Sequence, residues 1–179
     1  MTIERMLSAA PKYSVGASIY VANITGYTIS KITSSGTLTQ SWASLSTGPQ
    51  CLAFDSSGNL YSGNSNNTVS KITSGGAVTN SWASLAAGAN PQYIVVDGSG
   101  NIFTANYGNN NISKITSAAS VTQAWASLAT GAGPYALAFD TSGNMFSANY
   151  GDSTISKITS GGSVTQAWGT CYSGGPRHI

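Results

Sequence analysis

A tetrapeptide that recurs at a nearly fixed interval constrains this chain more than any other feature. The sequence Ser-Lys-Ile-Thr begins at Ser30, Ser70, Ser113 and Ser156, so successive copies are 40, 43 and 43 residues apart. Two other residue types follow nearly the same intervals: Trp42, Trp82, Trp125 and Trp168, and Pro11, Pro49, Pro91, Pro134 and Pro176. Repeats of this length are typical of solenoids, propellers and other arrays. The 179 residues are therefore one unit used four times.

Each unit divides into four short strand-like runs separated by turn residues. In the last unit these runs cover 135–139, 145–148, 154–159 and 164–168. The link after the first run, Asp140 to Asn144, has an Asp that can bond the backbone ahead of it and a Gly143 that tolerates positive φ. No segment shows a sustained helical period. A four-stranded meander repeated in this way predicts an all-β fold, a β-propeller with four four-stranded antiparallel blades.

The repeat also predicts how the chain is divided. We expect an N-terminal extension at 1–10, four blades at about 11–47, 48–88, 89–131 and 132–170, and at 171–179 the start of a further strand or a closure segment. The first strand of the first blade is expected at 11–15. Three arrangements stay open: a closed four-blade propeller, an incomplete arc completed by oligomerisation, and a piece of a larger gene product. We favour self-association, because an open arc exposes apolar blade faces.

The blade consensus resembles a known family. It reads Gly-Pro-x-x-Leu-Ala-Phe-Asp-x-Ser-Gly-Asn, then an apolar pair, then Asn-x-Ile-Ser-Lys-Ile-Thr, and it is similar to NHL-type propellers, most of all to the virginiamycin B (streptogramin) lyase branch. The resemblance covers Pro11 to Trp168. It implies a His base, a magnesium-held substrate and acidic residues near the central channel.

This chain lacks much of that machinery. Its only histidine is His178 and its only glutamate is Glu4, and Asn stands where lyase blades often carry an acidic residue. We therefore expect no catalytic residues, no metal and no cofactor, and a recognition or structural module in place of an enzyme. The alternative is a streptogramin-lyase-like enzyme whose reactive groups are lost or shared between subunits.

Composition excludes several partners. Charged residues make up 7% of the chain and the net charge is +2, too little for the basic stripe that nucleic acids require. No apolar run approaches the ~18 residues of a membrane span. Residues 1–7 lack the apolar stretch of a secretory signal. A surface rich in Ser, Thr and Asn favours an extracellular or particle-surface location. Cys51 and Cys171 allow at most one intramolecular disulfide, and whether they pair stays open.

The candidate binding residues lie in the loops that follow the second strand of each unit. In a meander these loops share one face, where Asn and Tyr offer amide groups beside aromatic rings, a combination suited to a neutral polar ligand such as a carbohydrate, or to a protein. The candidates are Asn23, Tyr27, Asn64, Asn106, Tyr107, Asn149, Tyr150 and Asp152. The alternative role for the asparagines is structural, since Asn stabilises its own turn. The four tryptophans are expected to pack between blades. The four repeated lysines are expected to lay their stems along the blade with their charged ends in solvent.

Overall fold

The computed structural model describes residues 18–171 and 174–179, and strands form almost all of its regular structure. The predicted extension at 1–10 and the predicted strand at 11–15 lie outside the described residues. One short 3-10 helix, η2 (Tyr107–Asn109), interrupts the strand pattern. No helix among the described residues is long and apolar enough to cross a membrane.

Within residues 18–171 and 174–179, fifteen strands form four antiparallel sheets, and in each sheet neighbours in sequence are neighbours in space. The first sheet has three described strands, β1 (Ile19–Asn23), β2 (Thr28–Ile32) and β3 (Leu38–Ser44). The second has β4 (Pro49–Phe54), β5 (Leu60–Asn64), β6 (Thr68–Ile72) and β7 (Val78–Ser84). The third has β8 (Pro91–Val96), β9 (Ile102–Asn106), β10 (Asn111–Ile115) and β11 (Val121–Ser127). The fourth has β12 (Pro134–Phe139), β13 (Met145–Asn149), β14 (Thr154–Ile158) and β15 (Val164–Thr170).

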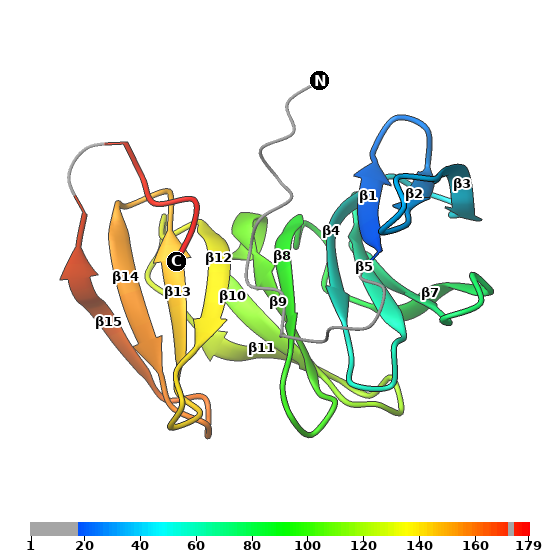
Figure 1. The fold of residues 1–179 in the computed structure, drawn as a ribbon. Coiled ribbons are helices and arrows are strands. Elements are labelled where there is room, and N and C mark those ends of the chain that lie inside the picture. Colours follow the sequence, from blue (N-terminus) through cyan, green and yellow to red (C-terminus); the bar gives the residue numbers. More distant parts are fainter. Residues whose placement is uncertain (1–17, 172–173) are drawn as a thin grey trace.

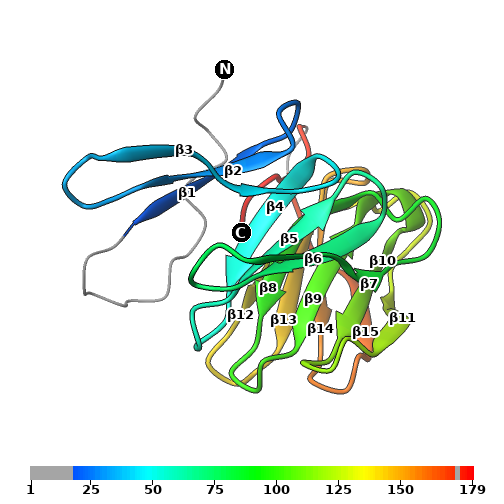
Figure 2. The same ribbon diagram turned by 90° about the vertical axis from the view of Figure 1, so that its right-hand side faces the viewer.

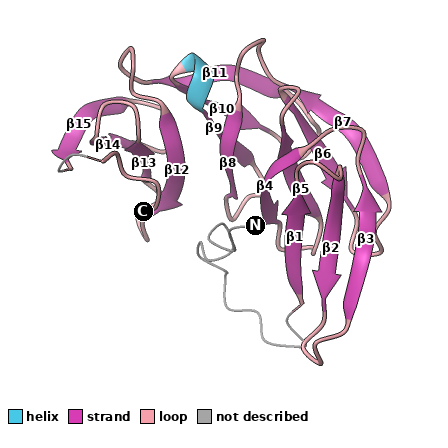
Figure 3. Cartoon of the chain, turned by 90° about the horizontal axis from the view of Figure 1, so that it is seen from above, coloured by secondary structure: helices cyan, strands magenta, loops and turns pink. Residues whose placement is uncertain are grey.

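The four sheets stand side by side around an arc (Figure 1). Seen from above, β4, β8 and β12 lie toward the inside of the arc and β7, β11 and β15 lie outside (Figure 3). Figure 2 looks along the arc from the end formed by β1 to β3. Consecutive meander sheets fanned in this way are propeller blades. The predicted all-β propeller class is confirmed.

The core is divided into layers, each enclosed between two neighbouring blades. Between the first and second blades, Ile29 and Ala43 pack with Leu60 and Ile72. Equivalent layers join the second blade to the third and the third to the fourth. The predicted packing between blades is confirmed for three of the four tryptophans, since Trp42, Trp82 and Trp125 each pack against one of these layers, whereas Trp168 is exposed. Each blade is therefore stabilised by its neighbours, as in other repeat folds.

An aspartate closes the turn between the first and second strands of a blade. In the fourth blade, Asp140 Oδ1 accepts hydrogen bonds from the backbone N–H groups of Ser142 (2.9 Å) and Asn144 (2.8 Å), and its Oδ2 accepts one from Asn144 Nδ2 (2.8 Å). Gly143 has a φ of +79°, which glycine adopts without steric cost. The turn chemistry read from the sequence is present here, and it recurs around Asp55 and Asp97.

The fourth strand of every blade contains a β-bulge that the sequence pattern did not predict. The register of β14 with β15 shifts between Ile155 and Lys157, and the third strand of each other blade shows an equivalent shift. The residue before each tryptophan has positive φ: Ser41 (51°), Ser81 (49°), Ala124 (48°) and Ala167 (45°). Such a bulge bends the strand and re-aims the side chain that follows it.

Candidate functional site

The asparagines that end the second strands are held inside their own blades. Asn64, Asn106 and Asn149 are buried, and Asn23 is half-buried. In the fourth blade, Asn149 Nδ2 donates to Thr154 Oγ1 and to Ser156 Oγ, both at 2.9 Å. Asn23, Asn64 and Asn106 repeat this pair of bonds to the third strand. These contacts favour the structural alternative, since the buried amides link two strands and are shielded from a ligand.

The third blade departs from this pattern at one position. Ser62 and Ser147 donate to the Oδ1 atoms of their asparagines at 2.8 Å, but Thr104 occupies the equivalent place in the third blade. Thr104 Oγ1 and Asn106 Oδ1 are buried and have no hydrogen-bond partner. A buried polar group without a partner loses its hydration uncompensated, so this blade carries a destabilising defect.

Three tyrosines meet on the loop face, and we call Tyr107, Tyr135 and Tyr150 the tyrosine cluster. The ring centroids of Tyr107 and Tyr135 are 6.4 Å apart at 88°, and those of Tyr135 and Tyr150 are 5.8 Å apart at 48°. All three side chains are half-buried, so part of each ring is accessible. Tyr107 and Tyr150 were predicted from the repeat. Tyr135 was missed because it belongs to a strand, β12, and only the fold brings it beside the loops.

The C-terminal segment lies against this cluster. The guanidinium of Arg177 is 4.7 Å from the ring centroid of Tyr150, and Arg177 Nη2 donates to Tyr150 Oη at 3.2 Å. Gly175 lies close to the side chain of Tyr150, and Gly133 lies equally close to that of Tyr107. The two glycines have similar positive φ values, 55° and 53°. The segment thus begins as the first strand of a blade does, although residues 174–179 form no strand. It adds a cation beside the aromatic rings.

The two remaining candidates, Tyr27 and Asp152, contribute to their own loops. Tyr27 is exposed in the loop after β1, and its carbonyl oxygen accepts a hydrogen bond from the backbone N–H of Leu45 (2.7 Å). Asp152 is exposed, and its Oδ1 accepts hydrogen bonds from Thr154 N (3.1 Å) and Thr154 Oγ1 (2.7 Å). The carboxylate therefore stabilises the loop that contains it.

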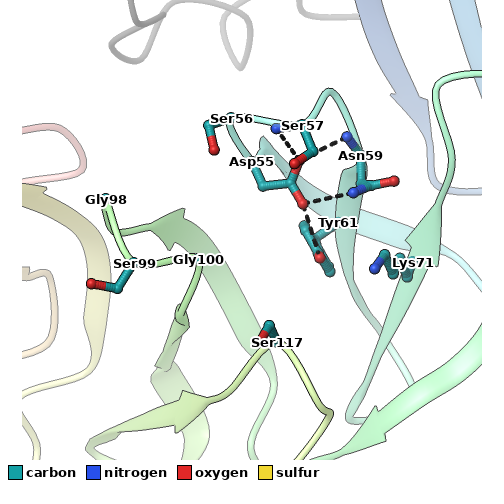
Figure 4. Close-up of a pocket in the computed structure, with 10 residues that line it drawn as sticks. All are labelled: Asp55, Ser56, Ser57, Asn59, Tyr61, Lys71, Gly98, Ser99, Gly100 and Ser117. Atoms are coloured by element: carbon teal, nitrogen blue, oxygen red, sulfur yellow. Dashed lines mark hydrogen bonds between the residues drawn. The ribbon is translucent and has the colours of Figure 1, made fainter.

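The opposite face carries a groove that the sequence did not indicate. It lies between the second and third blades, has a volume of about 320 Å³, and is lined by Asp55, Tyr61, Lys71 and Ser117 among others (Figure 4). Lys71 Nζ lies 5.7 Å from the ring centroids of both Tyr61 and Trp82. The repeated lysines are half-buried, which agrees with stems that lie along the blade, and their ammonium groups also lie over aromatic rings, which the sequence did not indicate.

The carboxylate in this groove, Asp55, is already hydrogen-bonded within its own turn. Tyr61 Oη donates to Asp55 Oδ2 at 3.2 Å. Burial and the negative charge of Asp55 raise the pKa of Tyr61 to about 12. Burial alone would raise the pKa of Asp55, but hydrogen bonds from Asn59, Tyr61 and Ser57 outweigh it and lower that pKa. The groove holds a neutral phenol and a saturated carboxylate, which is a poor arrangement for acid–base chemistry.

A metal or nucleophilic centre is likewise not assembled in the part of the chain that the structure describes. No group of three or more His, Cys, Asp or Glu residues is placed to hold a metal ion there. His178 is exposed in the C-terminal segment, and Glu4 lies outside the described residues. Cys51 and Cys171 form no disulfide.

These features define a β-propeller arc with an aromatic loop face. Solved structures with the same fold include virginiamycin B lyase from Staphylococcus aureus, with a TM-score of 0.74 and 19% identity over 83% of this chain and 50% of that one. A catalytically inactive form of the lyase with quinupristin gives 0.75 and 20%, over 85% and 52%. A Bacteroides thetaiotaomicron protein of unknown function gives 0.65 and 17%, over 83% and 44%.

The predicted likeness to the virginiamycin B lyase propeller is confirmed at the level of fold. The chain spans about half the length of these structures. No protein-family model and no curated protein sequence matches it.

Proposed function

We propose that this chain is a non-catalytic recognition module that binds a neutral polar ligand, such as a carbohydrate, on its loop face. The observation that carries the proposal is the tyrosine cluster. Tyr135 contacts both of the other rings, all three rings stay partly accessible, and the phenol groups add hydrogen-bonding capacity to an apolar surface. Partly exposed aromatic rings beside polar groups suit the alternating apolar and hydroxyl surfaces of sugars. The same surface would also suit a loop of a protein partner.

Binding of neutral oligosaccharides tests this proposal. The experiment compares the parent chain with the double variant Tyr107→Ala, Tyr150→Ala on an oligosaccharide array, followed by calorimetry of any sugar that binds. Ile24→Ala is the matched control, because Ile24 occupies the equivalent loop position in the first blade. We expect binding that falls at least tenfold in the double variant and is unchanged in the control. Equal binding by all three proteins, or no sugar bound by the parent, would overturn the proposal.

A second candidate function is a lyase-like activity with reactive groups shared between subunits, favoured by the fold that the chain shares with virginiamycin B lyase. Its remaining candidate group is His178, which is exposed. Incubating the parent and His178→Ala with quinupristin, followed by mass spectrometry, tests it. Turnover by the parent that the variant loses would establish this function in place of the non-catalytic one.

A third candidate is an assembly or decoration protein on the surface of a particle or virion. The apolar faces at the two ends of the arc favour it, because they suit contacts between chains. The mass of the purified chain in solution tests this candidate, because an assembly protein should form particles larger than one chain.

A further inference from the structure

The contact between neighbouring blades is built three times from equivalent residues. We call the side of a blade that packs on the next blade its forward face, and the side that packs on the previous blade its rear face. On the forward face of the first blade, Tyr20 lies 4.9 Å from Trp42 and 5.0 Å from Phe54 of the second blade, measured between ring centroids. In the third blade, Phe103 makes the same pair of contacts, with Trp125 and with Phe139 of the fourth. In the second blade Tyr61 contacts Trp82 with centroids 5.3 Å apart, and Val96 of the third blade takes the place of the phenylalanine. Equivalent positions therefore form all three interfaces.

The first blade presents a rear face of this design to solvent. The residue that begins the second strand is at most 1% exposed in the later blades, where it is Leu60, Ile102 or Met145. In the first blade it is Ile19, which is 52% exposed. Leu38, at the start of β3, is 51% exposed, whereas its counterparts in the later blades are half-buried.

The fourth blade presents the complementary forward face. Trp168 is 58% exposed, while the other three tryptophans are half-buried. Its ring still contacts Phe146 of its own blade, with centroids 5.1 Å apart. Ile155 is half-buried, although Ile29, Val69 and Ile112 at the same position are fully buried. Among the described residues, no blade precedes the rear face or follows the forward face (Figure 3).

A side-chain amide fixes the register of each internal interface. Gln123 Nε2 donates to Ser84 O of the preceding blade at 3.0 Å, and Gln123 Oε1 accepts from Ala86 N at 3.0 Å. Gln166 makes the same two bonds to Ser127 and Ala129 of the third blade. Gln40 is the equivalent residue of the first blade, and it is exposed. On a fourth blade, the carbonyl oxygen equivalent to those of Ser84 and Ser127 belongs to Thr170, and the amide of Gln40 would donate to it.

A glycine turn completes the match. A Cβ on Gly76 would lie 3.4 Å from Trp42 Cε2, and a Cβ on Gly162 would lie 3.1 Å from Trp125 Cε2, so these turns sit on the tryptophan of the preceding blade. Gly36 is the equivalent residue of the first blade, and a Cβ there would meet nothing within 4 Å. The tryptophan that this turn would cover at the other end of the arc is Trp168.

We propose that the partner of each arc end is a second copy of this chain, which packs its first blade on the fourth blade of the other. Because the two faces differ, the contact is head to tail, and two copies make it twice around a two-fold axis. The result is a closed ring of eight blades, which lies within the usual range of propellers.

The partner is a second copy because the interface is continuous with the one inside the chain. Ile19, Leu38, Gln40 and Gly36 stand at the positions through which the later blades contact their predecessors, although Asn80 replaces the glutamine in the second blade and Ala119 the glycine in the third. Trp168 repeats the tryptophan that the first three blades present to their successors. Closing the ring also covers the two exposed apolar faces at the ends of the arc, which otherwise favour aggregation. This inference is independent of ligand binding on the loop face.

Light scattering on the purified chain at high micromolar concentration tests the inference. We expect a mass twice the 18.2 kDa of the chain. The variants Leu38→Glu and Trp168→Glu place a charge on one face each, and both should return the mass to that of one chain. Ile24→Glu is the matched control, since Ile24 is an exposed apolar residue (44%) away from both faces.

Circular dichroism of every variant separates loss of association from loss of folding. Leu38 and Trp168 are exposed within one chain, so a folded single chain is the expected form of both variants. A parent of single-chain mass, a series of larger masses in place of one doubled mass, or folded variants that stay associated would each overturn the inference.

Discussion

Removing the amide of Asn149 tests whether the repeated asparagines are structural. Asn149 accepts from Ser147 Oγ and donates to Thr154 Oγ1 and Ser156 Oγ. In Asn149→Ala the Ser147 hydroxyl, which is fully buried, loses its partner, whereas Ser156 keeps a long bond to Gln166 at 3.4 Å. An unsatisfied buried group costs about 1–3 kcal/mol, and the other lost bonds cost about 1 kcal/mol together. We expect the free energy of unfolding to fall by about 2–4 kcal/mol.

The matched variant is Asn23→Ala. Asn23 makes the same two bonds, to Thr28 and Ser30, but it is half-buried, so water can replace part of what is lost. We expect a loss of about 1 kcal/mol there. Urea denaturation followed by circular dichroism measures both, with equal slopes required for the comparison. Two equal losses, or a loss for Asn149→Ala below about 1 kcal/mol, would refute the structural role.

Three further outcomes follow from the same contacts. Thr104→Ser gives Asn106 the hydroxyl partner found in the second and fourth blades, so we expect a gain of about 1 kcal/mol in urea denaturation, partly offset by the lost methyl group; a net loss would contradict it. Asp55 has a lowered pKa in the folded chain, so its contribution to stability is present above about pH 4 and is lost as pH falls through the folded value. Thermal unfolding of Asp55→Asn should therefore show a weaker dependence on acid than the parent. Trp125→Ala opens a gap inside a blade interface and should cost about 3 kcal/mol; at concentrations where the chain is single, Trp168→Ala should cost less.

Periodicity alone located most of the fold. Turn residues around Asp140 and Gly143 separate apolar runs that became β12 and β13, and the four-strand unit indicated blades. The β-bulge before each tryptophan was not predicted, because positive φ at Ala124 or Ala167 depends on the pairing of two strands and leaves no mark in composition. The strand expected at 11–15 lies outside the described residues.

The site was less predictable because it depends on burial. The sequence placed Asn64, Asn106 and Asn149 in the loops after the second strands, whereas each is the last residue of its strand and is buried. Whether an amide faces solvent or the next strand is decided by packing, which composition does not reveal. Tyr135 joined the tyrosine cluster only through the neighbouring blade. The arc ends were foreseen as exposed apolar faces, yet the roles of Gln40 and Gly36 became visible only beside their internal counterparts.

Cross-linking between chains tests the central claim, that the ends of the arc complete each other, most directly. Gln40→Cys and Thr170→Cys are introduced into separate chains whose native cysteines are replaced by serine, and the mixture is treated with a short bismaleimide. Gln123→Cys with Ser84→Cys in one chain is the control, since this pair meets inside the arc. Head-to-tail closure predicts that the mixture yields a two-chain product while the control cross-links within one chain. A mixture that stays single-chain while the control reacts would contradict the claim.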